Sequence, residues 1–337
     1  MAPPLTVSCI DGLIRPPREA HLSSTSLSTL PITTPPTTNP ASDYSFAWPS
    51  NPIVAGLISM SGTAAGIAPR PSSLATSLWY NTTLALNCGD ASTPPSTLLT
   101  CMQSVPARSL IATLLNTISA PHSTPYSPTT DNTLVFTDPS THPTAPLPML
   151  IGTTDNESGL FRVFVPPQPN LAPAEEDAFW HNQTQSIFNC PAAARAQRSA
   201  RRDGNPTWRY RWHGVFPDTE LARTPPSGAY HDSEVGVLFG VVDGTVVGGG
   251  TGTGEEAEVG RYMRGAWAAF ARDPRRGLEG YAREWYGRED GGGEGKGKGK
   301  GKGWPRYVAG EETLVRLGWE GKPGASVVRG DMYDDGC

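Results

Sequence analysis

The chain has no run of about eighteen apolar residues, the length that a membrane-spanning helix needs, so we expect no membrane span. Its first residues lack the basic start and apolar block of a signal peptide, and we expect none. Neither sign of charge dominates, because the formal net charge is −5 and the isoelectric point is about 5.7. This balance gives no electrostatic reason to expect a nucleic-acid partner.

The sequence also lacks a cofactor motif. A glycine-rich stretch at residues 244–254 has the wrong spacing for a dinucleotide-binding fingerprint and is interpreted as a flexible linker. We therefore expect no cofactor and no metal ion.

Glycine and proline are abundant, with 37 Gly and 34 Pro, while only 37% of the residues are apolar. This composition indicates a loop-rich fold with weakly structured segments. Residues 1–40 include a stretch of mostly Ser, Thr and Pro, and we predict that they are disordered. Residues 290–303 form a second low-complexity segment of Gly, Lys and Glu. Its lysines could contact an anionic partner, but a solvated surface insertion is the favoured interpretation.

Residues 148–161 read Pro-Met-Leu-Ile-Gly-Thr-Thr-Asp-Asn-Glu-Ser-Gly-Leu-Phe. Residues 149–151 predict a short strand buried on both faces, ending at Gly152 and followed by a polar loop that contains Glu157. In open α/β sheets, chemistry collects on loops at the carboxyl ends of strands. Taken alone, this stretch favours a structural interpretation, in which Glu157 is a solvated loop residue or caps a helix that starts at Leu160.

A strand is also predicted for residues 207–216, where aromatic and basic residues alternate. The alternation is typical of a half-buried strand with Arg209, Arg211 and His213 exposed. Residues 256–273 carry apolar residues at helical spacing and end at Asp273-Pro274, so they predict an amphipathic helix.

Residues 225–240 read Pro-Pro-Ser-Gly-Ala-Tyr-His-Asp-Ser-Glu-Val-Gly-Val-Leu-Phe-Gly. Together with the Glu157 stretch, this segment resembles the type-B carboxylesterase/lipase (cholinesterase-like) family, in particular its fungal members. Residues 41–64 and the Met-x-x-x-Trp-x-x-Phe-Ala pattern at 263–271 extend the resemblance, which covers residues 41–337.

The resemblance implies an α/β fold, namely the C-terminal part of an α/β-hydrolase fold, with an incomplete sheet and covering helices. It also implies that Glu157 is the acid and His231 the base of a catalytic triad. An ordinary histidine pKa of about 6.5 suits a base at working pH. The chain order in this fold is nucleophile, acid, base, so a serine is expected upstream of Glu157.

No Gly-x-Ser-x-Gly and no His-Gly-Gly occurs in the 337 residues, and Thr-Thr-Asn-Pro stands where the family has its nucleophile elbow. Ser61 lies after a strand without the strand-to-helix turn of an elbow, so we assign it a supporting role near the acid. The chain is thus interpreted as a carboxylic ester hydrolase family member that is truncated and inactive, acting in its lineage on small-molecule or lipid esters. The alternative is a non-catalytic cholinesterase-like binding or interaction protein.

The resemblance has two further consequences. The family's early strands are missing, so the strand that ends at Met60 is expected to have an unpaired edge. The family pairs its cysteines, which implies disulfides Cys88–Cys101 and Cys190–Cys337 and leaves Cys9 over. Free thiols are the alternative in a cytosolic protein. Glycosylation sequons at Asn81 and Asn182, with the disulfides, suit a secreted, extracellular lineage.

Overall fold

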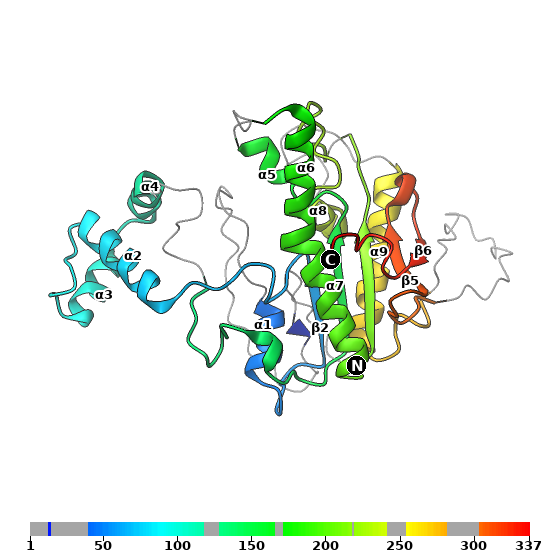
Figure 1. The fold of residues 1–337 in the computed structure, drawn as a ribbon, viewed down its shortest axis with the longest axis horizontal. Helices are drawn as coiled ribbons and strands as arrows, with labels where there is room; N and C mark the ends of the chain where they lie inside the picture. Colours follow the sequence, from blue (N-terminus) through cyan, green and yellow to red (C-terminus); the bar gives the residue numbers. More distant parts are fainter. Residues whose placement is uncertain are drawn as a thin grey trace, which may run out of the picture.

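The computed structural model of the chain describes residues 13–14, 40–117, 128–165, 171–217, 219–240, 254–281 and 303–337. Six strands form one mixed sheet, in which β2 to β5 run parallel and β1 and β6 run antiparallel at the two edges (Figure 1). The strands are, in sheet order, β1 (Leu13–Ile14), β2 (Gly56–Met60), β3 (Met149–Thr154), β4 (Thr207–Trp212), β5 (Glu312–Leu317) and β6 (Ala325–Arg329). This arrangement confirms the predicted α/β class.

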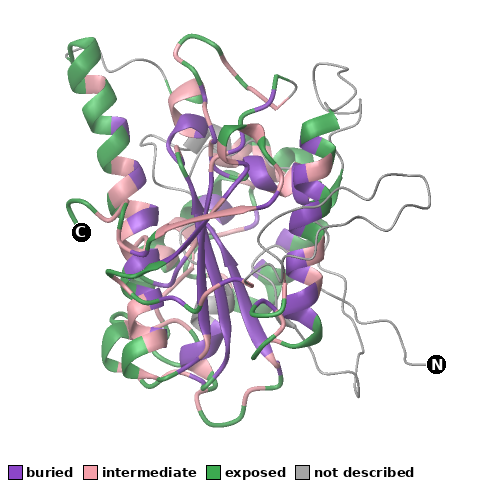
Figure 2. Ribbon diagram, turned by 90° about the vertical axis from the view of Figure 1, so that its right-hand side faces the viewer, coloured by how far each residue is buried: buried purple, intermediate pink, exposed green. Residues whose placement is uncertain are grey.

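Helices cover both faces of the sheet, and the central strands are buried between them (Figure 2). One face packs against α8 (Ser233–Phe239) and α9 (Gly254–Arg272), and the other against α1 (Pro40–Ala47) and α7 (Cys190–Gln197). The helix predicted for residues 256–273 is therefore confirmed as α9, whose apolar stripe faces the sheet. No helix in the described ranges combines the length and the apolar character needed to cross a membrane.

The remaining helices lie at the periphery. Helices α2 (Ser72–Ala85), α3 (Pro95–Ser104) and α4 (Ala107–Thr117) form a lobe beside the sheet, at the left of Figure 1. Near the carboxyl ends of the strands lie α5 (Gly159–Phe164) and α6 (Pro173–Gln183). Two π-helical segments, η2 (Thr184–Asn189) and η3 (Arg198–Arg202), directly follow α6 and α7. Two short 3-10 turns are η1 (Pro139–Thr141) and η4 (Trp319–Gly321).

Both expected disulfides are present. Cys88 and Cys101 are bonded inside the α2–α4 lobe, and Cys190 at the start of α7 is bonded to Cys337, the last residue. The first bond cross-links the α2–α4 lobe, whose small apolar cluster contains Leu98 and Met102. Cys9 lies outside the described residues.

The prediction of a half-buried β4 is wrong, because all six of its residues are buried. Trp208, Tyr210 and Trp212 point into the core under α9. Arg209 and Arg211 occupy the opposite face, where they are buried against polar partners rather than exposed to water. A buried arginine is tolerated when its donors are satisfied, and those partners come from segments far away in the sequence.

The predicted end of the strand at Gly152 is also wrong, since β3 continues to Thr154. The glycine is needed for packing: a Cβ at this position would lie 2.2 Å from the Tyr210 ring on the neighbouring strand. Gly152 therefore lets the ring of Tyr210 lie against the backbone of β3.

The expectation of an unpaired edge on β2 is corrected by β1, which pairs antiparallel with it through Leu13↔Leu57 and Ile14↔Gly56. Two residues of the segment predicted to be disordered thus form an edge strand. The other residues before Pro40, and residues 290–302 of the low-complexity segment, lie outside the described part of the chain.

Candidate active site

The Glu157 carboxylate is held in the tight turn that follows β3. Its Oε1 accepts a hydrogen bond of 2.7 Å from the backbone N–H of Thr154, and its Oε2 lies 2.7 Å from Nδ1 of His231. Both side chains are buried. The two residues are 74 positions apart in the sequence, and the fold brings them into direct contact.

Backbone contacts join the loops that carry these two residues. The N–H of His231 donates to the carbonyl of Glu157 at 3.3 Å, and the N–H of Asn156 donates to the carbonyl of Ala229 at 2.9 Å. Gly159 permits the close approach, because a Cβ there would lie 2.1 Å from the carbonyl oxygen of Ser227. The site is therefore built on ordered backbone rather than on side-chain contacts alone.

The imidazole of His231 lies beside two aromatic rings, with centroid distances of 5.9 Å to Phe161 and 4.9 Å to Phe188. Its second nitrogen, Nε2, is 3.7 Å from Oδ1 of Asp232. Asp232 adopts a left-handed backbone conformation with φ of 70°, which starts the turn into α8.

The charge state of His231 differs from the sequence expectation. Burial by itself lowers the pKa of the imidazole, but the hydrogen bond to Glu157 and the nearby Asp232, Glu157 and Glu234 charges outweigh it and raise the pKa to about 9. The neighbouring carboxylates therefore favour the protonated form of the ring.

Glu234 is a part of the site that the sequence reasoning passed over. It lies three residues after His231, it is fully buried, and neither carboxylate oxygen has a hydrogen-bond partner within the described ranges. Burial, followed by the charges of Glu157 and Asp232, raises its pKa to about 8. No local signal in the sequence indicates this burial, because glutamate is almost never fully buried unless it is paired.

A second charged group lies beside the first. Oδ1 of Asp155 contacts Nε of Arg211 at 3.0 Å and Nδ1 of His213 at 3.3 Å. Burial raises the pKa of Asp155, but His213 and Arg211 outweigh this effect and lower it to about 2. His213 is thus enclosed rather than exposed as predicted, and its ring packs edge-on against Trp319.

Ser61 follows β2 directly and is buried, with a left-handed φ of 55°. Its N–H donates to the carbonyl of Gly152 at 2.9 Å, while its hydroxyl has no hydrogen-bond partner in the part of the chain that the structure describes. The next helix, α2, begins only at Ser72, so Ser61 does not occupy a strand-to-helix turn. Its supporting role stays a prediction.

The two sequons lie on exposed helix positions. Asn81 is exposed on α2 and Asn182 is exposed on α6. Their glycosylation also stays a prediction.

No family model matches the chain. Two curated fungal proteins do match it. The chain is 34% identical over 239 residues to a chlorogenic acid esterase of Aspergillus niger. This match covers 69% of the present chain and 43% of the esterase. It is 27% identical over 249 residues to secreted lipase 5 of Gibberella zeae, covering 70% of this chain and 45% of the lipase.

These features define an α/β protein with a buried acid–histidine pair beyond the carboxyl ends of its parallel strands. The particular relatives, an esterase and a lipase, support an esterase/lipase family for this chain. The chain spans less than half the length of each of these two proteins.

Proposed function

We propose that this chain carries the acid and the base of a serine-type carboxylic ester hydrolase of the type-B carboxylesterase/lipase family. The observation that carries the proposal is the buried 2.7 Å contact between Oε2 of Glu157 and Nδ1 of His231. In acyl transfer by such enzymes, a serine attacks the ester carbonyl while the histidine takes its proton and returns it to the leaving alcohol. Glu157 holds the imidazole in the tautomer that leaves Nε2 free to accept that proton.

The substrate class is a small-molecule or lipid ester, in keeping with the names of the two relatives. One relative is named as secreted, and the two disulfides suit an oxidising compartment, so we also place this lineage outside the cell.

The 337 residues contain no Gly-x-Ser-x-Gly, so they lack the turn that exposes a nucleophilic serine beside oxyanion donors. We expect this chain by itself to hydrolyse p-nitrophenyl acetate no faster than a protein-free control. Turnover that disappears in His231→Ala would contradict this expectation and direct the search for a nucleophile to Ser61.

A chimera tests the acid–base assignment directly. Residues 1–40 are replaced by the corresponding N-terminal part of the Aspergillus niger esterase, and hydrolysis of chlorogenic acid and of tributyrin is measured. Glu157→Gln and His231→Ala should each lower kcat in the chimera by about 10⁴-fold. His181→Gln, which changes an exposed histidine on α6, is the matched control and should leave kcat unchanged. An active chimera that is indifferent to His231→Ala would refute the proposal.

The second candidate is a non-catalytic cholinesterase-like binding or interaction protein. The missing elbow motif favours it. A chimera that is folded but inactive toward both esters would support this candidate over the first.

A further inference from the structure

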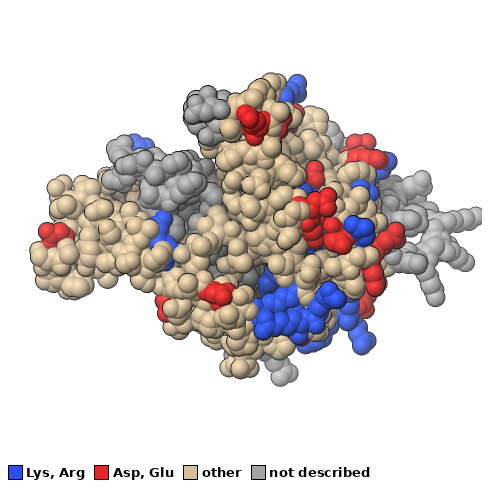
Figure 3. All heavy atoms as spheres, viewed as in Figure 1, with Lys and Arg blue, Asp and Glu red and all other residues tan. Residues whose placement is uncertain are grey.

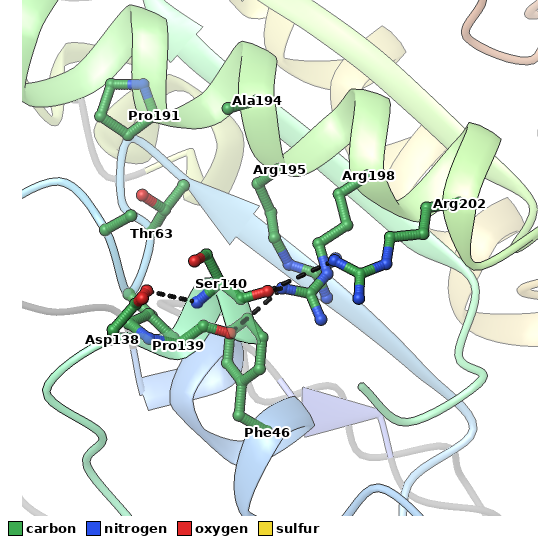
Figure 4. A pocket seen from close by; sticks show the side chains of 12 residues that line it. Phe46, Thr63, Asp138, Pro139, Ser140, Pro191, Ala194, Arg195, Arg198 and Arg202 are labelled. Atoms are coloured by element: carbon green, nitrogen blue, oxygen red, sulfur yellow. Dashed lines mark hydrogen bonds between the residues drawn. The ribbon is translucent and has the colours of Figure 1, made fainter. Parts of the chain in front are cut away.

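A cavity of about 280 Å³ lies on the α1 and α7 side of the sheet, away from the Glu157–His231 pair. Its walls come from four segments that are distant in the sequence: the end of α1, the residues after β2, the turn η1, and α7 with η3. Figure 4 shows Thr63 and Pro191 at one end of the cavity and Arg202 at the other. Neither Glu157 nor His231 contributes to its lining.

One wall of the cavity is cationic. Arg195, Arg198 and Arg202 follow one another at helical spacing and line the same side (Figure 4). Basic side chains gather on this face of the molecule, over the lower end of α7 (Figure 3). This concentration of arginine stands out in a chain whose formal net charge is −5.

The nearby carboxylates only partly balance these arginines. Asp203 lies 3.9 Å from Arg195 and 3.7 Å from Arg198, while it also accepts a hydrogen bond of 2.6 Å from Thr144. Asp138 uses Oδ1 to accept the N–H of Ser140 in its own turn. Three arginines thus face two carboxylates, so this wall keeps a net positive charge.

Some buried donors on this wall have no hydrogen-bond acceptor in the described part of the chain. They are Nε of Arg195 and Oγ1 of Thr63, while Nη1 of Arg195 and Nε of Arg198 reach Asp203 at ion-pair distance but make no hydrogen bond there. The Arg195 side chain is only 6% exposed, and burial lowers its pKa to about 10, so it stays charged at neutral pH. A buried cation with unused donors is unfavourable unless an anion neutralises it.

The rest of the lining includes an apolar side, made by Phe46 and three small residues. The Phe46 ring lies under two guanidinium groups, with centroid distances of 5.5 Å to Arg195 and 5.1 Å to Arg198. Pro191 and Ala194, on the same helix as Arg195 (Figure 4), and Ala65 after β2 complete the apolar side. The cavity thus joins an apolar body to a cationic rim, which is the complement of an amphiphilic anion.

We propose that this cavity is a binding site for a small organic carboxylate with an aromatic or short aliphatic body. The planar guanidinium fork matches a carboxylate. The apolar side selects an organic acid over inorganic phosphate, which has no body to place against Phe46. The site is independent of ester hydrolysis, and its failure leaves the Glu157–His231 assignment untouched.

Isothermal titration calorimetry of the full chain with benzoate tests the proposal, with benzamide and inorganic phosphate as the two comparison probes. Benzoate should bind at least about tenfold more tightly than either probe, since only benzoate has both features. Equal affinity for benzamide or for phosphate would overturn the proposal.

Variants place the binding at this cavity. Arg202→Gln should weaken benzoate about fivefold or more, and Arg202→Lys should restore part of the loss. Arg201→Gln is the matched control, because Arg201 is exposed on the same turn but does not line the cavity. An equal effect of Arg201→Gln would show nonspecific attraction and refute the site.

A cavity-filling variant gives a second test that does not remove charge. Ala194 lines the cavity from an exposed helix position, so Ala194→Phe should fold normally and block the apolar side. It should abolish benzoate binding while the thermal melting of the chain stays within a few degrees. Undiminished binding in a folded Ala194→Phe variant would contradict the proposal.

Discussion

Arg209 and Asp334 form a bidentate ion pair that joins the centre of the sheet to the last turn of the chain. Nη1 lies 2.7 Å from Oδ2 and Nη2 lies 2.7 Å from Oδ1. Nη2 also donates to Oδ1 of Asn189, and Nη1 donates to the carbonyl of Gly330. Two of these partners of the arginine, Gly330 and Asp334, lie more than 120 positions away in the sequence.

Removing the acid of this pair should destabilise the fold. Asp334→Asn leaves the buried guanidinium of Arg209 without its counter-charge, so the free energy of unfolding should fall by about 3–5 kcal/mol. Urea denaturation followed by tryptophan fluorescence measures this loss. Asp331→Asn is the control, because Asp331 pairs with Arg329 at the surface, where such a pair contributes at most about 1 kcal/mol. Equal losses in the two variants would show that the buried ion pair contributes no more to stability than the surface pair.

The pH dependence of stability should follow Glu234 and His231. The folded pKa of Glu234, about 8, lies above the ordinary value of 4.5, so between these pH values the folded state keeps a proton that the unfolded chain has released. Stability therefore falls as pH rises through this range, by up to about 1.4 kcal/mol per pH unit for each proton. His231 adds a fall of the same sign between pH 6.5 and about 9.

Glu234→Gln removes the first of these contributions. The variant should lose less stability than the parent chain between pH 5 and pH 8, measured by urea denaturation at several pH values. Glu311→Gln makes the same chemical change at an exposed glutamate. It should leave the slope of the free energy of unfolding against pH unchanged. An unchanged slope in Glu234→Gln would mean that the buried carboxyl does not hold its proton.

The packing of Tyr210 on Gly152 predicts a sensitive backbone position. Gly152→Ala forces a methyl group to within 2.2 Å of the ring, so β3 or β4 must shift. The expected cost is about 1–3 kcal/mol, typical of overpacking. Gly254→Ala, where an added Cβ meets nothing within 4 Å, is the control and should cost much less. The melting temperatures of both variants test this prediction. Equal melting temperatures would contradict a special packing role of Gly152.

Peptide mapping without reduction should recover two cross-linked peptides, Cys88–Cys101 and Cys190–Cys337, with Cys9 in neither. Cys337→Ser removes the longer cross-link and should lower the free energy of unfolding by about 2–5 kcal/mol. Cys9→Ser is the control, which should change neither the map nor the stability. A peptide that joins Cys9 to Cys88 or Cys101 would contradict this pairing.

Local pattern was sufficient for the parts of the fold that depend on neighbouring residues. The apolar stripe of α9 and the buried run that starts β3 could be predicted from the periodicity of the side chains. The two disulfides came from the family resemblance and not from their spacing. The contact of Glu157 with His231 had the same origin.

The burial of Arg209 and Arg211 could not be predicted, because alternation with aromatic residues is also the pattern of a strand with one wet face. Only the tertiary fold brings Asp334 and Asn189 to those guanidinium groups. The continuation of β3 through Gly152 depends in the same way on a ring of another strand. The raised pKa of His231 depends on its hydrogen bond to Glu157 and on the charge of the nearby Asp232, and only the tertiary fold brings Glu157 to the ring.

The bond between Cys190 and Cys337 encloses 147 positions of sequence, almost half of the chain. A protease that cuts once anywhere inside this loop therefore produces two pieces that remain covalently joined. Such a nicked molecule has the mass of the intact chain plus one water and migrates with it on a gel until a reductant is added. The integrity of any preparation must accordingly be judged after reduction.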